Sequence, residues 1–314
     1  MNPKVTIIVP TYNRYELLKK CMKSLLEQTY ENIEIIVINN GSQDNSSEYL
    51  NSLKEKDNRI KLIEFEKNTG SPYACYNAGI KEATGEYMTF MYDDDMLVHD
   101  AVESILNLDE HDVILAPCID EDSKELTVKS FGNVSKSITI KDMLNSNQGH
   151  GEESINFVKS DILKNYIFDE KAYGGEGLIW IEIINEHGAY YLHKGLRIYK
   201  KNESHEQFTG YENYFKNIER IIYSSEKYLE LYKKINVYDI AKTRYFKQVI
   251  LLIFLYLYSG DRKKLFIVLE DLKSFKLKVF IPFIILVGFL PNVLTKRLLI
   301  NMNKLRILLR ERKR

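Results

Sequence analysis

The first third of the chain alternates between short apolar runs and amphipathic segments, and this pattern restricts the fold more than any other feature. The apolar runs are rich in β-branched residues, which is typical of buried strands, and polar turn residues follow them. Strands that alternate with helices through short connections form a mostly parallel sheet with helices on its faces. The predicted strands are residues 5–9, 33–38, 60–65 and 87–92, and the predicted helices are residues 15–28, 45–56 and 73–83.

The strand predicted at residues 87–92 ends in three consecutive carboxylates, Asp93, Asp94 and Asp95. Adjacent carboxylates repel one another, and the repulsion is costly where water is scarce. Open α/β sheets bind ligands at the carboxyl ends of their strands, where a divalent cation would neutralise such acids. Acids also favour the N-terminus of a helix. The triplet therefore predicts either a cation site or the start of a helix.

Two more polar clusters follow predicted strands, one at residues 10–14 and one at residues 39–42. Because the carboxyl ends of parallel strands share one edge of a sheet, we expect both clusters to meet the acid triplet in a single crevice. The layout is Rossmann-like, but the first strand is followed by neither G-x-G-x-x-G nor a phosphate-binding loop. These omissions argue against a dinucleotide dehydrogenase and a phosphate-loop NTPase.

Charge is distributed unevenly along the chain. Residues 261–314 contain fourteen Lys or Arg and four Asp or Glu, a net charge of +10, and because the whole chain is neutral the first 260 residues carry −10. This asymmetry predicts an acidic body with a basic end that meets an anionic partner. The three widely spaced cysteines predict neither a disulfide framework nor a zinc cluster, which favours a reducing compartment. We expect no signal peptide at the N-terminus.

Three sequence blocks together resemble the nucleotide-binding half of glycosyltransferase family 2. In order and spacing they are VTIIVPTYNR, IIVINNGSQDNS and NTGSPYACYNAGIKEATGEYMTFMYDDD, within residues 4–110. The resemblance implies the α/β GT-A fold, a Rossmann-like, mixed but mostly parallel sheet flanked by helices. It implies a catalytic domain at residues 1–210, with a nucleotide-binding half at 1–110 and an acceptor half at 111–210. Residues 211–314 are predicted to form a helical C-terminal region.

The family pattern after the fourth strand is Asp-x-Asp-Asp, and here Tyr92 stands in place of the first Asp. The resemblance implies that Asp94 binds the metal, that Asp95 is an additional ligand or supports the site, and that Asp93 contacts the ribose. The cation would be Mn²⁺ or Mg²⁺, which take oxygen ligands and bridge the two phosphates of a nucleotide sugar.

The resemblance also implies a nucleotide-binding surface. A base can stack on Tyr12, and Arg14 can reach a phosphate. Asn39 replaces an Asp that accepts the uracil imide N–H, a bond that an amide oxygen can also accept. The implied nucleotide-binding residues are Pro10, Thr11, Tyr12, Arg14, Asn39, Asn68, Gly70, Asn77 and Asp93.

Attack by an acceptor hydroxyl requires a base on the far side of the anomeric carbon. The resemblance places this base at Glu176, because Gly177 stands where the family often has a second acid. The alternative is that Glu176 only favours a helix N-terminus. Trp180 could stack on a sugar or lie in the core. His205 is three residues beyond the position where many family members have a metal-binding His.

The C-terminal third predicts helices at residues 211–234, 238–258 and 262–273. Residues 279–290 form an uncharged apolar run that is too short to span a membrane. Residues 295–314 form a basic amphipathic segment suited to anionic lipid headgroups. The alternatives are packing on the catalytic domain and binding of nucleic acid; no motif supports the latter.

Together these features predict a glycosyltransferase, and the family resemblance implies an inverting one, because the family uses a single displacement. It would move a hexose or N-acetylhexosamine from a UDP-sugar to a hydroxyl of a glycan or lipid-linked acceptor. We expect it on the cytoplasmic face of a membrane as a peripheral protein, with no nucleic acid partner. One alternative is a nucleotidyltransferase with a related sheet, although PTYNR lacks the glycine-rich basic loop of such enzymes. Another is an inactive glycosyltransferase-like scaffold, because Tyr92, Asn39 and Gly177 depart from the family pattern.

Overall fold

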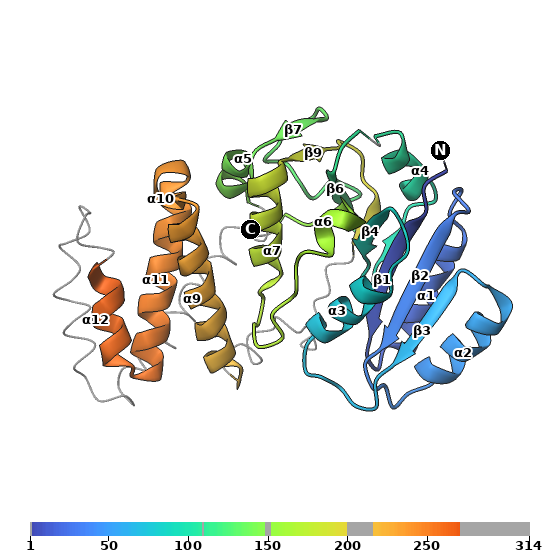
Figure 1. The fold of residues 1–314 in the computed structure, drawn as a ribbon, viewed down its shortest axis with the longest axis horizontal. Coiled ribbons are helices and arrows are strands. Elements are labelled where there is room, and N and C mark those ends of the chain that lie inside the picture. Colours follow the sequence, from blue (N-terminus) through green and yellow to red (C-terminus); the bar gives the residue numbers. More distant parts are fainter. Residues whose placement is uncertain (1, 109, 148–151, 200–215, 271–314) are drawn as a thin grey trace. The chain divides into compact units, whose positions relative to one another are not determined.

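The computed structural model describes residues 2–108, 110–147, 152–199 and 216–270 (Figure 1). The chain divides into two units. The sheet unit comprises Met1–Glu170 and Gly175–Gln207, and the helical unit comprises Lys171–Gly174 and Phe208–Arg314. The short segment Lys171–Gly174 thus groups with the helical unit, although the residues on both sides of it belong to the sheet unit.

Four parallel strands form one half of the sheet. The central strand β1 pairs with β2 and β4, and β2 pairs with β3. Most residues of β1 and β2 are buried, as expected of parallel strands covered on both faces. The strand predicted at residues 5–9 extends to Thr11, which pairs with Asn39 at the end of β2. The bounds are β1 Val5–Thr11, β2 Ile33–Asn39, β3 Ile60–Glu64 and β4 Tyr87–Phe90.

Antiparallel pairing makes the other half of the sheet mixed. Strand β8 lies between β4 and β6 and is antiparallel to both, and β10 is parallel to β6. Among the described residues the order is β3-β2-β1-β4-β8-β6-β10-β5, with β9 pairing to β6 and β7 to β9. The bounds are β5 Met96–Leu97, β6 Val113–Asp120, β7 Lys136–Ile138, β8 Ser154–Lys159, β9 Ala189–Tyr191 and β10 Arg197–Tyr199.

Helices cover the sheet, and α3 approaches β1 closely through a glycine. A Cβ atom on Gly79 would lie 2.5 Å from Cγ2 of Ile8, so a larger side chain would push α3 away from the strand. The helices of this unit are α1 Tyr15–Leu26, α2 Ser46–Lys56, α3 Tyr73–Glu82, α4 Ala101–Leu106, α5 Ile140–Asn145, α6 Ser160–Leu163 and α7 Glu176–His187.

The helical unit corrects two predictions of helix boundaries. The helix predicted at residues 211–234 is α9, which begins at Ile218, and residues 211–215 lie outside the described part. The single helix predicted at residues 238–258 is wrong, because the non-helical backbone of Ala241 (φ −145°, ψ 66°) separates α10 from α11. The helices are α9 Ile218–Lys234, α10 Val237–Ile240, α11 Lys242–Ser259 and α12 Arg262–Glu270.

Hydrogen bonds hold the segment Lys171–Gly174 to α9. The backbone N–H of Tyr173 donates to Ser224 Oγ at 2.7 Å, and the Tyr228 hydroxyl donates to the Gly174 carbonyl at 3.2 Å. Arg220 also donates to the Ala172 carbonyl at 3.0 Å. These bonds explain why the segment belongs to the helical unit.

The acid triplet lies in a turn between β4 and β5, so the alternative of a helix start is wrong. Within the part of the chain that the structure describes, no helix combines the length and apolarity needed to cross a membrane. The apolar run 279–290, the basic segment 295–314 and His205 lie outside the described residues.

Candidate active site

The carboxyl ends of β1, β2 and β4 bring the predicted polar loops together. Thr11 ends β1, and its hydroxyl donates a 2.7 Å hydrogen bond to Asp93 Oδ2. Arg14 Nη1 lies 2.7 Å from Asp94 Oδ2 and 3.2 Å from Asp93 Oδ1. Residues more than seventy positions apart in the sequence thus form one cluster, as the sheet topology predicts.

The cluster determines the charge of Asp93. Burial raises the pKa of Asp93 to about 6, although Arg14 and the Thr11 hydroxyl favour its ionised form. Arg14 contacts the acids directly, so its guanidinium supplies positive charge to the triplet in this structure.

Asp95 has a different partner. Its carboxylate lies 3.4 Å from Nε of Arg197, and both side chains are almost fully buried. The same guanidinium lies over the ring of Tyr92, 4.9 Å from the ring centroid, and donates to Cys118 Sγ at 3.1 Å. The residue that replaces the first family Asp therefore packs on a buried arginine.

The triplet fits a cation held by a single protein carboxylate. The side chain of Asp94 is 22% exposed, compared with 8% for Asp93 and 3% for Asp95. Among the described residues, no group of three His, Cys, Asp or Glu side chains is placed to hold a metal. Mg²⁺ and Mn²⁺ accept one or two carboxylates when phosphate and water complete the octahedron, so Asp94 suits either ion.

Of the other nucleotide residues, Asn39 is buried at the end of β2. Its Oδ1 accepts the N–H of Ser42 at 3.0 Å, and its Nδ2 donates to Glu64 Oε1 at 3.4 Å. Gly70 has a φ of +77°, a conformation that glycine adopts readily, and its N–H donates to Asn68 Oδ1 at 2.5 Å. These contacts shape the two loops.

Tyr12 and Pro10 lie on the β1 side of the same edge. The Tyr12 side chain is 40% exposed, which leaves its ring accessible to a stacking base. Pro10 lies within β1, opposite Ile38 of β2.

Asn77 is hydrogen-bonded to the backbone of Phe168 rather than to the acid triplet. Its Oδ1 accepts the Phe168 N–H at 2.8 Å, and its Nδ2 donates to the Phe168 carbonyl at 2.9 Å. A second residue of α3, Tyr73, accepts a 2.6 Å hydrogen bond from the N–H of Gly175. Helix α3 therefore fixes two points of the segment that leads to Glu176.

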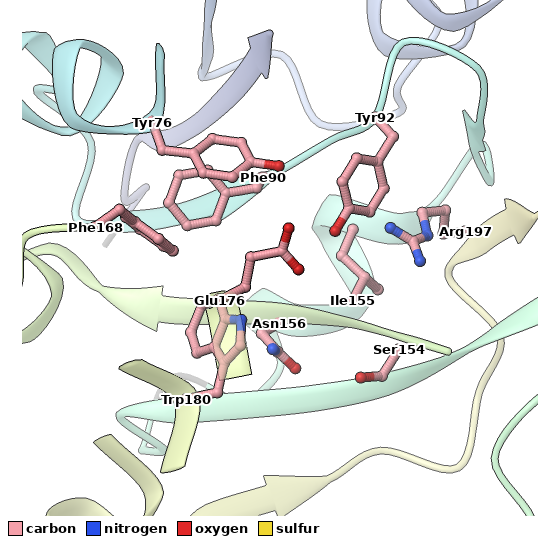
Figure 2. A pocket seen from close by; sticks show the side chains of 10 residues that line it. All are labelled: Tyr76, Phe90, Tyr92, Ser154, Ile155, Asn156, Phe168, Glu176, Trp180 and Arg197. Atoms are coloured by element: carbon pink, nitrogen blue, oxygen red, sulfur yellow. The ribbon is translucent and has the colours of Figure 1, made fainter. Parts of the chain in front are cut away.

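Glu176 begins α7 and projects into a cavity (Figure 2). Its carboxylate points toward the space between Tyr76 and Tyr92. Within the described residues, nothing forms a hydrogen bond or an ion pair with this carboxylate. The cavity is lined by Tyr76, Phe90, Tyr92, Ser154, Ile155, Asn156, Phe168, Glu176, Trp180 and Arg197.

Burial and a neighbouring acid alter the acidity of Glu176. Burial and, to a smaller extent, the charge of Glu153 raise the pKa of Glu176 to about 7, with Arg197 offsetting part of the increase. A carboxyl group with a pKa near neutrality can both accept and hold a proton under physiological conditions. A raised pKa of this kind fits the role of general base predicted for Glu176.

Sequence reasoning did not select several residues of this cavity, notably Tyr76, Ser154 and Asn156. Tyr76 is buried, and its ring centroid lies 4.5 Å from that of Phe90, another residue of the cavity. The sequence of β8 does contain an indication of the cavity, because the polar residues Ser154 and Asn156 alternate there with the buried apolar residues Ile155 and Phe157. Polar side chains on an inward face of a central strand indicate a lined cavity.

Comparison with known proteins identifies a family. The sequence profile of "Glycosyl transferase family 2" matches residues 6–166, just over half of the chain. The GalNAc(5)-diNAcBac-PP-undecaprenol beta-1,3-glucosyltransferase of Campylobacter jejuni is 32% identical over 204 residues, which cover 63% of this chain and 65% of that protein. The glycosyltransferase GlyA of Streptococcus pneumoniae is 43% identical over 105 residues, 33% of this chain and 15% of GlyA. The chain thus spans less than two thirds of either relative.

Solved structures share the fold. S. aureus TarS 1–349 in complex with UDP has a TM-score of 0.61 at 18% identity, covering 96% of this chain and 91% of that one. The mannosyltransferase PcManGT of Pyrobaculum calidifontis, in complex with GDP-Man and Mn²⁺, has a TM-score of 0.53 at 16% identity, covering 93% and 87%. The likeness confirms the predicted GT-A fold. With the profile match, it establishes that the chain belongs to glycosyl transferase family 2.

Proposed function

We propose that the protein is an inverting glycosyltransferase that moves a hexose or N-acetylhexosamine from a UDP-sugar to a hydroxyl of a glycan or lipid-linked acceptor. The observation that carries the proposal is the Glu176 carboxylate, which has a pKa near 7 and projects into a cavity that adjoins the acid triplet. Tyr92 and Arg197 line this cavity, and they are respectively the chain neighbour of Asp93 and the partner of Asp95.

In the proposed reaction, Glu176 takes the proton of the acceptor hydroxyl while the hydroxyl oxygen attacks the anomeric carbon. The bond from that carbon to the diphosphate oxygen breaks on the opposite face, so the configuration inverts and the nucleoside diphosphate leaves. A divalent cation, when bound at Asp94, supplies positive charge to the leaving diphosphate. Arg14 and Thr11 hold Asp93 and Asp94 in place for ribose and cation.

The relatives support this choice of substrates. The Campylobacter protein is named as a glucosyltransferase acting on a polyprenyl diphosphate glycan, TarS has been solved with UDP and with UDP-GlcNAc, and the archaeal mannosyltransferase holds Mn²⁺. We extend to this chain a UDP-sugar donor, a glycan or lipid-linked acceptor, and Mn²⁺ or Mg²⁺ as the cation.

The test of this function is release of nucleoside diphosphate by the full chain. A panel of UDP-glucose, UDP-galactose, UDP-GlcNAc, UDP-GalNAc and GDP-mannose is incubated with Mn²⁺, with Mg²⁺ or with a chelator. We expect release from a UDP-sugar only when a cation is present. Asp94→Asn should abolish this release, whereas Asp122→Asn in an exposed turn should not. Absence of release from every donor would favour an inactive scaffold.

We further propose that the protein is peripheral to the cytoplasmic face of a membrane. The basic segment 295–314, outside the described residues, would meet anionic lipid, which also holds a lipid-linked acceptor. Flotation with liposomes of anionic or zwitterionic lipid tests this contact. We expect binding to anionic vesicles that weakens with salt, and equal recovery with both lipids would contradict the proposal.

A further inference from the structure

Two polar side chains in the Glu176 cavity take no part in the chemistry proposed above. Ser154 and Asn156 are two residues apart on β8 and therefore project from one face of the strand. In Figure 2 they lie across the cavity from Tyr76 and Tyr92, with the Glu176 carboxylate between the two pairs. A ligand that reaches Glu176 therefore has polar groups of β8 on one side.

Asn156 presents an unsatisfied hydrogen-bond acceptor. Its Oδ1 is buried and has no hydrogen-bond partner among the described residues. A buried acceptor left without a donor destabilises the folded chain, so such an atom in a cavity wall is suited to a ligand that brings the donor. Among the described residues, buried side-chain atoms without a hydrogen-bond partner also occur in Ser46, Thr89 and Glu152. Those three residues do not line this cavity, whereas Asn156 does.

Trp180 adds an aromatic wall to the same cavity. It follows Glu176 by four residues on α7, so the two side chains lie on the same face of that helix. Its ring meets Phe90 edge to face, with centroids 6.2 Å apart. A cavity with aromatic walls and a few fixed polar groups suits a ring that has one apolar face and hydroxyls at its edge.

We infer that this cavity binds a single pyranose of the acceptor, and that Asn156 selects it by accepting a hydrogen bond from a hydroxyl or acetamido N–H. The inference rests on the proposed function, in which the acceptor hydroxyl must reach Glu176. Asn156 is a specificity residue that contacts the acceptor, and Trp180 supports the apolar face of the sugar.

The sequence contains a single tryptophan, so selective excitation of Trp180 reports directly on occupancy of the cavity. The full chain is titrated, without donor, with the methyl β-pyranosides of glucose, galactose, GlcNAc and GalNAc. We expect a saturable fluorescence change with at least one of them. In Asn156→Ala the affinity for that sugar should fall about tenfold, the effect of roughly one hydrogen bond. Asn165→Ala, on an exposed residue after α6, should bind as the wild type.

Deoxy or deacetylated analogues identify the donor group on the sugar. Removing the group that Asn156 recognises should weaken binding to the wild type about tenfold and leave binding to Asn156→Ala unchanged. Asn156→Asp keeps an acceptor oxygen at this position. Sugar binding by this variant, and the UDP affinity of each variant, show whether the fold is intact. The inference is overturned if no pyranoside changes the fluorescence, or if Asn156→Ala binds the sugar as tightly as the wild type.

Failure of the inference and failure of the proposed function give different results. If sugar binding depends on Asn156 but no donor is turned over, the sugar site is supported and the transferase proposal is contradicted. If a donor is turned over while Asn156→Ala leaves the acceptor KM unchanged, the transferase proposal is supported and the sugar site is contradicted.

Discussion

At the scale of single residues, the properties of the site depend on the surroundings of three buried carboxylates. Asp93, Asp95 and Glu176 all lie where water is scarce, but the first two have cationic partners and Glu176 has none within hydrogen-bonding distance among the described residues. Burial raises the pKa of both Asp93 and Glu176, to about 6 and to about 7. Among the described residues Asp93 is ion-paired with Arg14, whereas Glu176 is not paired and has the higher pKa.

The pH dependence of transfer should follow Glu176. A general base acts in its ionised form, so kcat/KM should fall as the pH drops through about 7. Glu153→Gln removes a like charge that raises the pKa of Glu176, so the acid limb should move to lower pH. A pH series of initial rates for wild type and variant tests this. A limb that stays in place, or moves to higher pH, would contradict the assignment. Glu55→Gln, on an exposed residue of α2, is the matched control.

At the scale of elements, the parallel half of the sheet was predictable because its signals are local. The runs that form β1 to β4 are apolar and continuous, and their polar ends meet at one edge as parallel topology requires. Asn77 was not predictable in the same way, because its hydrogen-bond partner is Phe168, ninety-one residues away. The break at Ala241 likewise interrupts a pattern that favours one continuous helix.

Helix α3 should matter for catalysis as well as for packing. The Tyr73 hydroxyl accepts the N–H of Gly175, the residue before Glu176, so Tyr73→Phe removes a bond that fixes the start of α7. We expect kcat to fall about tenfold while the KM for the donor stays unchanged. Steady-state rates with varied donor measure both values. Tyr49→Phe provides the control, and a rise in donor KM with unchanged kcat would show that Tyr73 acts on nucleotide binding instead.

At the scale of the whole molecule, the division into units was only partly visible in the sequence. The amphipathic patterns after residue 210 predict a helical region, but nothing local indicates that Lys171–Gly174 groups with it. That grouping arises from hydrogen bonds to Ser224 and Tyr228 on α9. The segment ends at Gly174, two residues before the proposed base Glu176, with only the N-cap residue Gly175 between them.

Ligand binding should stabilise the folded chain in a cation-dependent way. UDP at about one hundred times its Kd stabilises a folded protein by about 2.7 kcal/mol, which raises the unfolding temperature. We expect the rise with UDP to be larger when Mn²⁺ is present, and the additional part to disappear in Asp94→Asn. The unfolding temperature, measured with UDP, with Mn²⁺, with both and with neither, gives each of these increases. An additional rise that survives in Asp94→Asn would place the cation elsewhere.

The most direct measurement of the central claim is transfer by Glu176→Gln, from the preferred UDP-sugar to the best pyranoside of the panel. Gln is nearly isosteric but cannot take up the proton, so transfer should fall by about 10²–10⁴-fold. UDP affinity should match the wild type, and the unfolding temperature at neutral pH should be no lower, because Gln avoids burying a charge. Transfer at close to the wild-type rate, with UDP still bound, would contradict the assignment of Glu176 as the base.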